Sequence, residues 1–334
     1  MLTTALIEHV LAAIPHRTVG LLGDLFLDRY LDIDPARDEL SVETGLTAYQ
    51  VVGVRAYPGA LGTVLNNLAA LGVGRIVPIA AIGDDGEGYE LRQALAATAG
   101  VELDGVFAAP GRRTPTYTKP MYGMKELNRL DIKNRTSTPV AVEDTIIGLL
   151  EAAWPRLDAL IVLDQVSEVD CGVVTKRVRD RLAELGERDP TKFVLADSRE
   201  QIGLFRNVCV KPNRAESQRI HMEMTSVADP WTQICRHVGG AVFETNGPAG
   251  IRLAADPTAV NAKFIPAYPV SGPIDICGAG DSCSAGITCA MVAGATHEQA
   301  AAFGNLVASI TIQQIGVTGT APPDAVRRRW REVE

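Results

Sequence analysis

The chain has 334 residues with a hydrophobic content of 46%, which is enough for a large buried core, and its formal net charge is −8. An acidic surface argues against nucleic acid or an anionic membrane as the main partner, because both repel it. None of the six cysteines forms a C-x-x-C pair, which argues against a zinc site and suits a reducing cytoplasm. No apolar run is long enough to cross a membrane.

The apolar start, residues 1–14, lacks a basic region and a cleavage site, so we expect a helix there and no signal peptide. Segments typical of strands and of helices then alternate. The predicted strands cover residues 18–22, 75–82, 159–163, 193–196, 208–211, 241–244 and 251–254. The predicted helices cover residues 61–71, 89–97, 145–154, 169–185, 280–292 and 297–315. Because most strands are apolar runs without alternation, we predict one α/β domain (residues 1–334) whose mainly parallel sheet is covered by helices on both faces.

Two segments interrupt this alternation. Residues 30–58 follow the first strand and are rich in Asp, Thr, Val and Tyr, and residues 114–131 have a similar polar character that favours strands. We expect both segments to leave the main sheet and to pair as a small β lid, which would exclude water from a site on closure. The alternative is two ordinary long loops.

The most informative motif covers residues 275–281, where Asp275 and Asp281 flank two glycines, Gly278 and Gly280, at a predicted loop-to-helix junction. Glycine lets the backbone approach a ligand closely, and the first amides of a helix favour an anion such as phosphate. Asp281 could accept the proton of a hydroxyl, so the pattern fits phosphoryl transfer to an alcohol. The alternative is a glycine turn with Asp281 as a helix cap.

Polar residues also follow other predicted strands. After the first strand, Asp24 and Asp28 could accept hydrogen bonds from sugar hydroxyls, or act as turn and capping residues. Gly59 and Thr63 open the next helix, where they could contact a substrate or only permit tight packing of the helix on the sheet. Residues 83–88 contain acids without the spacing of a calcium loop, and helix capping explains them better.

Two further loops could contact a nucleotide. Asn213 and Glu216 share one helix face and could hold Mg²⁺ through its water ligands, although the same spacing occurs in a capping box. Thr245, Gly247 and Gly250 follow another strand and could contact phosphates, or form a plain turn. No histidine adjoins these loops, and the chain lacks the nucleophile elbow, the P-loop and the Rossmann fingerprint.

Taken in order, these motifs resemble the PfkB (ribokinase-like) carbohydrate kinases over residues 19–320. Residues 275–281 resemble the family's D-T-x-G-A-G-D signature. Residues 23–30 are similar to the G-D-V-M-L-D-R-Y of the heptose-7-phosphate kinase domain of ADP-heptose synthesis proteins, and Arg129-Leu130-Asp131 matches an R-L-D in the lid of those proteins. The resemblance implies a ribokinase-like three-layer α/β/α sandwich with a small β lid.

The resemblance also implies roles for single residues. Asp281 would be the catalytic base, and the amides of Gly278, Ala279 and Gly280 would form the anion hole for the developing charge. ATP would contact Asn213, Thr245, Gly247, Gly250 and Asn305, the last of these near the adenine. The acceptor would contact Asp24, Asp28, Gly59, Thr63 and Arg129. Asn213 and Glu216 would organise Mg²⁺, and Asp275 would help to hold a monovalent cation such as K⁺.

The chain departs from the family pattern mainly on the substrate side. Gly59-Ala60 and Thr63 stand where the family has a Gly-Gly pair and then an Asn. Leu163-Asp164-Gln165 replaces the Ser-Asp-Tyr of the heptose kinases, and Cys277 replaces a Thr that they carry after the aliphatic residue. The chemistry residues are therefore kept, whereas the residues expected to contact the sugar differ.

We therefore expect an ATP-dependent kinase of a sugar or sugar phosphate, with a heptose phosphate as one candidate. Lys119, Lys125 and Arg129 of the lid segment could pair with a substrate phosphate, or be solvated surface charges. The alternatives are a nucleoside kinase of the same fold and a non-catalytic protein that binds a sugar or a nucleotide. Because lid-mediated dimers are common among the relatives, we expect a cytoplasmic homodimer that binds neither nucleic acid nor membrane.

Overall fold

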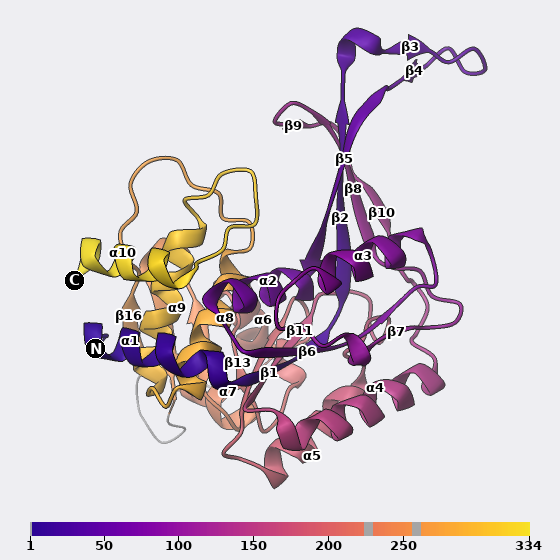
Figure 1. The fold of residues 1–334 in the computed structure, drawn as a ribbon. Helices are drawn as coiled ribbons and strands as arrows, with labels where there is room; N and C mark the ends of the chain where they lie inside the picture. The colour runs from indigo at the N-terminus through magenta and orange to yellow at the C-terminus, as the bar shows by residue number, and fades with distance from the viewer. Residues whose placement is uncertain (1, 224–229, 256–261) are drawn as a thin grey trace.

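The computed structural model describes residues 2–223, 230–255 and 262–334. Its main body is a nine-stranded sheet with helices on both faces, and a second, smaller sheet rises from this body (Figure 1). The arrangement confirms the predicted α/β fold with a small β lid. Within the described ranges, no helix combines the length and the apolar character that a membrane span requires.

The main sheet has the strand order β16-β15-β14-β13-β12-β11-β1-β6-β7. All neighbours from β7 to β14 are parallel, whereas β15 and β16 are added antiparallel at one edge. The strands are β1 (Thr18–Gly23), β6 (Arg75–Ile82), β7 (Val106–Ala108), β11 (Ala159–Asp164), β12 (Phe193–Ser198), β13 (Cys209–Val210), β14 (Val242–Thr245), β15 (Gly250–Ala254) and β16 (Lys263–Pro266).

The central strands bury side chains on both faces. On β11, for example, Ile161 belongs to one hydrophobic cluster and Val162 to the other. One cluster includes residues of α1 (Thr4–Ala13), α2 (Leu61–Leu71), α3 (Gly86–Ala96), α8 (Ala279–Val292), α9 (His297–Thr311) and α10 (Pro323–Val333). The other includes residues of α4 (Val140–Ala153), α5 (Lys176–Arg188), α6 (Arg214–Glu223) and α7 (Pro230–Val238). This double burial explains the continuous apolar runs in the sequence.

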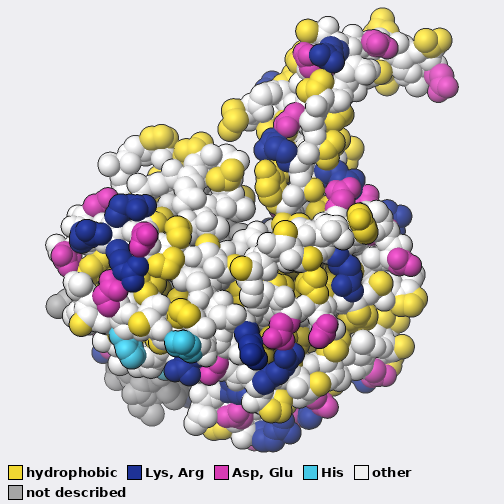
Figure 2. Space-filling model, in the orientation of Figure 1, with side chains coloured by type: hydrophobic (Ala, Val, Ile, Leu, Met, Phe, Trp, Pro, Cys, Tyr) yellow, Lys and Arg dark blue, Asp and Glu magenta, His cyan; other side chains and the backbone are white. Residues whose placement is uncertain are grey.

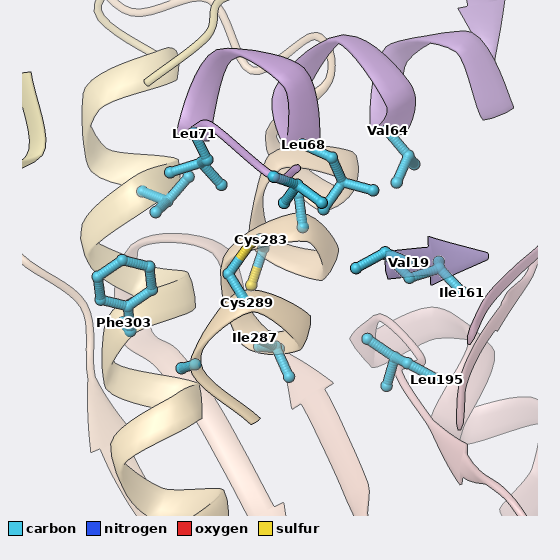
Figure 3. Packing of buried hydrophobic residues seen from close by; sticks show 14 of the residues in the cluster. Val19, Val64, Leu68, Leu71, Ile161, Leu195, Cys283, Ile287, Cys289 and Phe303 are labelled. Atoms are coloured by element: carbon cyan, nitrogen blue, oxygen red, sulfur yellow. The ribbon is translucent and has the colours of Figure 1, made fainter. Parts of the chain in front are cut away.

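Helix α8 is buried along most of its length after its first turn. Cys283 and Cys289 lie among apolar side chains of α2 and α9, including Leu68 and Phe303 (Figure 3). Their thiols are buried and unpaired, as expected for cysteines that act as small hydrophobic residues. This packing fixes the direction of α8 and therefore the position of the amides at its N-terminus.

The two segments predicted to leave the main sheet form the small β lid. Its sheet has the order β10-β8-β2-β5, with β9 beside β8. The strands are β2 (Leu25–Ile33), β5 (Val51–Ala60), β8 (Thr116–Tyr122), β9 (Lys125–Glu126) and β10 (Leu130–Ile132), and a hairpin of β3 (Glu39–Leu40) and β4 (Thr47–Ala48) extends the tip. Figure 2 shows the lid standing away from the body with hydrophobic side chains along it.

The structure corrects several predicted boundaries. The helix predicted over 169–185 begins only at Lys176, because the hydroxyl of Thr175 caps its first turn and the preceding residues form a loop. The helix predicted from residue 89 begins at Gly86, since Asp85 accepts a hydrogen bond from the amide of Gly88. Helices α7 and α10 and strands β7 and β16 were not predicted from the sequence.

Candidate active site

The candidate active site lies where the parallel strands of the main sheet end at their carboxyl side. Asp24 follows β1, Asp164 ends β11, Asp197 lies near the end of β12 and Lys211 follows β13. Asp281 lies in the first turn of α8, close enough to Asp197 and Lys211 for their charges to act on it. Ligands of doubly wound sheets bind beyond this strand edge, so the position suits a substrate site.

The N-terminus of α8 is built as a turn that only glycine adopts easily. Gly278, the residue before the helix, has a φ of 76°, and a Cβ there would lie 3.2 Å from the Cγ2 atom of Thr63. Within the described residues, the amides of Gly278 and Gly280 have no acceptor, whereas Ala279 donates to the carbonyl of Ile276 over 3.1 Å. The structure therefore leaves the amides of Gly278 and Gly280 open as anion donors, whereas the amide of Ala279 is engaged within the turn, so its predicted part in the anion hole stays a prediction.

A substitution of Gly278 by Ala tests this turn. Alanine at this position would have to adopt the left-handed backbone conformation, and its Cβ would press on Thr63. We therefore expect the free energy of unfolding to fall by about 1–2 kcal/mol. Because the amides at the N-terminus of α8 would shift, we also expect kcat to fall by a larger factor than the Kd for ATP changes. Thermal unfolding and steady-state kinetics check both effects, with Gly294→Ala as the control, because Gly294 also has positive φ and open space around it.

The carboxyl group of Asp281 has an unusual electrostatic environment. Burial raises its pKa to about 7, and the nearby charge of Asp197 adds to this effect. The cations of Lys211 and Arg199 oppose the shift. A carboxylate whose pKa lies near neutrality can take a proton and release it again at physiological pH, which is the property required of a general base.

Lys211 is a site residue to which sequence reasoning gave no role. Its side chain is 4% exposed, and its Nζ atom lies 2.7 Å from Oδ2 of Asp197. Burial would lower the pKa of this ammonium, but the charge of Asp197 outweighs that effect and the net shift is upward. The lysine therefore stays charged beside Asp281 and next to Gly280, whose Cβ position would be 3.6 Å from Nζ.

Asn213 and Glu216 form the capping box that was the alternative to a metal site. The Asn213 amide and side chain donate to Glu216 over 2.7 and 2.6 Å, and the amide of Glu216 donates to Asn213 over 3.0 Å. Burial raises the pKa of Glu216 to about 7. Since both carboxylate oxygens already have donors, the pair fits an ion held through water and phosphate better than one bound directly. No group of three ligating side chains that could hold a metal ion occurs among the described residues.

The other residues predicted to contact the nucleotide lie on β14, in the turn between β14 and β15, on β15 and on α9. Thr245 donates its amide to the carbonyl of Pro212, so the two candidate nucleotide loops are joined. Gly247 has a φ of 53° and open space around it. Gly250 is buried, and a Cβ would lie 2.2 Å from the carbonyl oxygen of Ile265, so strand packing explains this glycine. Asn305 donates to the carbonyls of Ile265 and Pro266 and ties α9 to β16.

Asp24 is held as a structural carboxylate. It is 4% exposed and accepts hydrogen bonds from the amides of Gln165, Val166 and Val173 over 2.8–3.3 Å. Burial raises its pKa despite these three bonds. This geometry assigns Asp24 to the loop after β11 and leaves it little capacity for a sugar hydroxyl, in contrast to the sequence-based expectation.

Asp28 lies where β2 enters the lid and is the more accessible of the two aspartates. Its Oδ1 atom lies 3.5 Å from Nζ of Lys119, which also donates to the hydroxyl of Tyr30 over 3.2 Å. A Cβ on Gly59 would lie 2.4 Å from Oδ2 of Asp28, so a larger residue at position 59 would displace that carboxylate. Burial raises the pKa of Asp28, against the effect of Lys119.

Thr63 and Arg129 lie in different parts of the structure. Thr63 is buried beneath Gly278, which places it at the anion turn instead of at an open sugar pocket. Arg129 pairs with Asp131 over 2.7 Å and lies 4.3 Å above the ring of Tyr117. The acceptor residues predicted from the sequence therefore line two regions, the turn before α8 and the base of the lid.

Asp275 anchors the loop before α8. Its two carboxylate oxygens accept the amides of Cys277 and Gly316, each over 3.0 Å. Its own amide donates to the carbonyl of Ile312 over 2.8 Å. With both oxygens engaged, the side chain serves the loop itself, and the predicted monovalent cation stays a prediction.

The main body is a doubly wound α/β sheet with polar residues at its strand ends, and comparison with known proteins identifies its family. The model of the pfkB family of carbohydrate kinases matches residues 30–324. The chain therefore belongs to the pfkB family of carbohydrate kinases, as the resemblance indicated.

Similarity to curated proteins supports the more specific resemblance to the heptose-7-phosphate kinase domain. The chain is 28% identical over 314 residues to the bifunctional protein HldE of Citrifermentans bemidjiense, covering 92% of this chain and 62% of that protein. It is 28% identical over 325 residues to the same-named protein of Caulobacter vibrioides, covering 93% and 63%. The chain thus spans less than two thirds of these relatives.

Solved structures confirm the ribokinase-like fold. A ribokinase from Thermotoga maritima superposes with a TM-score of 0.65 at 15% identity, covering 94% of this chain and 99% of that one. An Arabidopsis thaliana ribokinase complexed with ribose and ATP gives a TM-score of 0.63 at 17% identity, covering 94% and 98%.

Proposed function

We propose that the protein transfers the γ-phosphoryl group of ATP to a hydroxyl of a sugar or sugar phosphate, a heptose phosphate being one candidate. The observation that carries the proposal is the position of Asp281, whose pKa is raised to about 7, in the first turn of α8 beside the free amides of Gly278 and Gly280. A base and an anion site at one helix end are the two parts that phosphoryl transfer to an alcohol needs.

In this reaction, the oxygen of the acceptor hydroxyl attacks the γ-phosphorus while its proton passes to Asp281. The bond between the γ-phosphorus and the bridging oxygen breaks, and ADP leaves. The amides of Gly278 and Gly280, with the dipole of α8 behind them, stabilise the charge on the phosphoryl oxygens. Lys211 supplies a buried positive charge at the same place, and its ion pair with Asp197 fixes its position. Thr245 and Gly247 lie at the strand end where the polyphosphate chain of ATP would be bound.

Mg²⁺ would neutralise the phosphates of the nucleotide and orient them. The capping box of Asn213 and Glu216 fits this role through water ligands, because Mg²⁺ retains part of its hydration shell. Glu216 would accept hydrogen bonds from those waters once the bound ion favours its ionised form.

The test is an ADP-release assay with ATP, Mg²⁺ and a panel of neutral sugars, sugar phosphates and nucleosides. We expect turnover with at least one sugar or sugar phosphate and none that depends on a nucleoside. Turnover with nucleosides alone would identify a nucleoside kinase. ATP binding by calorimetry without turnover on any acceptor would support a non-catalytic protein and contradict the proposal.

We further propose that the protein is a homodimer joined through its lid. Strand β5 is the free edge of the lid sheet, and its Val52 and Val54 are more than half exposed. An exposed edge strand with apolar side chains favours pairing with a second copy. We expect Val52→Asp with Val54→Asp to convert a dimer into a monomer in light scattering, while Tyr89→Asp, at an exposed aromatic residue on α3, leaves the mass unchanged.

A further inference from the structure

The lid touches the body of the molecule at a second place, away from its stem. The stem is held by Arg29 of β2, which pairs with Glu87 and Glu90 of α3. Farther along the lid, the turn between β8 and β9 projects toward the C-terminal part of the chain, drawn in yellow (Figure 1). Met124 of this turn contacts Gly316, where a Cβ would lie only 2.8 Å from the Cε atom of Met124.

The surface that receives Met124 is bare backbone beside apolar side chains. Gly316 lies in the loop after α9 and has a φ of 76°, a conformation that favours glycine. Ile315 and Val317, on either side of it, are about half exposed, and Ile276 in the loop before α8 is 73% exposed. A methionine suits such a surface, because its unbranched thioether adapts its shape to an irregular apolar partner.

The loop of Gly316 is joined to the glycine turn before α8. The amide of Gly316 donates to Oδ2 of Asp275 over 3.0 Å, and Oδ1 of the same carboxylate accepts the amide of Cys277. Thr318, two residues farther on, packs against this turn, since a Cβ on Gly278 would lie 3.4 Å from the Cγ2 atom of Thr318. A displacement of Gly316 therefore moves the turn whose amides would hold the transferred phosphoryl group.

The polar side chains of the lid that face the site lie between the stem and Met124. Lys119 is in the middle of β8, and its Nζ atom lies 3.5 Å from Oδ1 of Asp28 on β2. The charge of Asp28 acts on Asp281. Cys277 lies close enough to Lys119 to influence its pKa. Because the lid is tied at its stem, a contact at Met124 keeps this face of the lid over the glycine turn.

We propose that Met124 is a positioning residue that holds the lid against the loop of Gly316 and so keeps water out of the site during phosphoryl transfer. The inference rests on the proposed kinase function and adds to it a residue remote from the reacting atoms. A methyl group on a glycine is a weak contact, which suits a lid that must open for substrates in every turnover. When the contact is lost, water replaces the acceptor hydroxyl in attacking the γ-phosphorus, and the products are ADP and inorganic phosphate.

The first experiment measures how tightly ATP cleavage is coupled to phosphorylation of the acceptor. We expect Met124→Ser to raise the KM of the acceptor about 3- to 10-fold and to increase the share of ADP that is released without phosphorylated acceptor. Met124→Leu keeps an apolar side chain and should behave as the wild type. Leu46→Ser is the control, because Leu46 is also an exposed apolar residue of the lid. Coupling that is unchanged in Met124→Ser, or altered equally in Leu46→Ser, would overturn the inference.

A double-mutant cycle tests the contact itself. Gly316→Ala places a Cβ where the methyl group of Met124 lies, so it should also raise the KM of the acceptor. The same change should have a much smaller effect in Met124→Ser, in which the obstructed group is absent. Gly272→Ala, at another positive φ with open space around it, measures the effect of backbone strain alone. Additive effects at positions 124 and 316 would show that the two residues do not act on each other and would contradict the proposal.

A distance measurement without turnover separates this inference from the kinase proposal. Spin labels are attached at Val42→Cys on the lid tip and at Arg328→Cys on α10, both exposed positions, in a Cys277→Ser parent. The labelled protein is diluted with unlabelled protein and saturated with Mg²⁺ and a non-hydrolysable ATP analogue. We expect Met124→Ser to shift the distances to longer values and Met124→Leu to match the parent, even if no acceptor is phosphorylated. Identical distance distributions in all three proteins would contradict the role of Met124.

Discussion

Replacing Asp281 by Asn is expected to lower kcat about 100- to 10,000-fold, since an amide cannot take the proton of the acceptor hydroxyl. The side chain keeps its size at the first turn of α8, and the buried helix behind it is unchanged. We therefore expect the Kd for ATP to change little and the thermal midpoint to stay the same or rise. Removing a charge from a desolvated position next to Asp197 is the reason for a rise.

The control for this prediction is Asp84→Asn, at an exposed aspartate in the turn before α3. Both variants are measured with saturating ATP and the best acceptor from the panel. Equal kcat values in wild type and Asp281→Asn would remove Asp281 from its proposed role. An equal loss in Asp84→Asn would show that the assay reports a general effect of neutralising acids.

Replacing Lys211 by Met is expected to destabilise the protein by about 3 kcal/mol, because the nearly buried carboxylate of Asp197 then loses its ion-pair partner. The variant should also lose activity, since a positive charge disappears from the anion site. With that cation gone, the pKa of Asp281 should rise further, because Lys211 is one of the two cations that lower it.

The double variant Lys211→Met with Asp197→Asn separates the two effects. It removes the unpaired carboxylate, so we expect most of the stability to return while kcat stays low. Urea unfolding and steady-state rates measure the two quantities. Recovery of full activity in the double variant would mean that Lys211 serves only to neutralise Asp197.

The architecture could be predicted from the sequence because its signals are local. Apolar runs such as β11 revealed a sheet buried on both faces, and the polar segments between them revealed the lid. The start of α5 was wrong by several residues because Val173 and Val174, which continue the apolar pattern, belong to a buried loop. That loop wraps around Asp24, a long-range contact that no local pattern indicates.

The candidate site was predicted in part. Glycines at the start of α8 and the acid beside them were recognisable because their spacing is itself the signal. Lys211 was given no role, since its function depends on the register of two strands. Ala196 pairs with Val210, so Asp197 and Lys211 follow side by side, but the sequence does not show which strands are neighbours.

Long-range packing also explains why Asp24 and Thr63 differ from expectation. An aspartate and a threonine can both bind sugar hydroxyls. In the structure, however, the carboxylate of Asp24 accepts hydrogen bonds from backbone amides, and Thr63 lies against the glycine turn before α8.

The pH dependence of kcat in the wild type is the sharpest test of Asp281 as the catalytic base. Asp281 must be deprotonated to act as a base, and burial raises its pKa to about 7. The assay uses saturating Mg²⁺ and ATP at every pH, so that nucleotide binding stays constant. We expect kcat to rise by up to tenfold per pH unit on the acidic side of neutrality, where Asp281 is protonated, and to level off once its carboxyl group is ionised. A profile that is flat through neutrality, in wild type assayed under the same saturating conditions, would contradict Asp281 as the base.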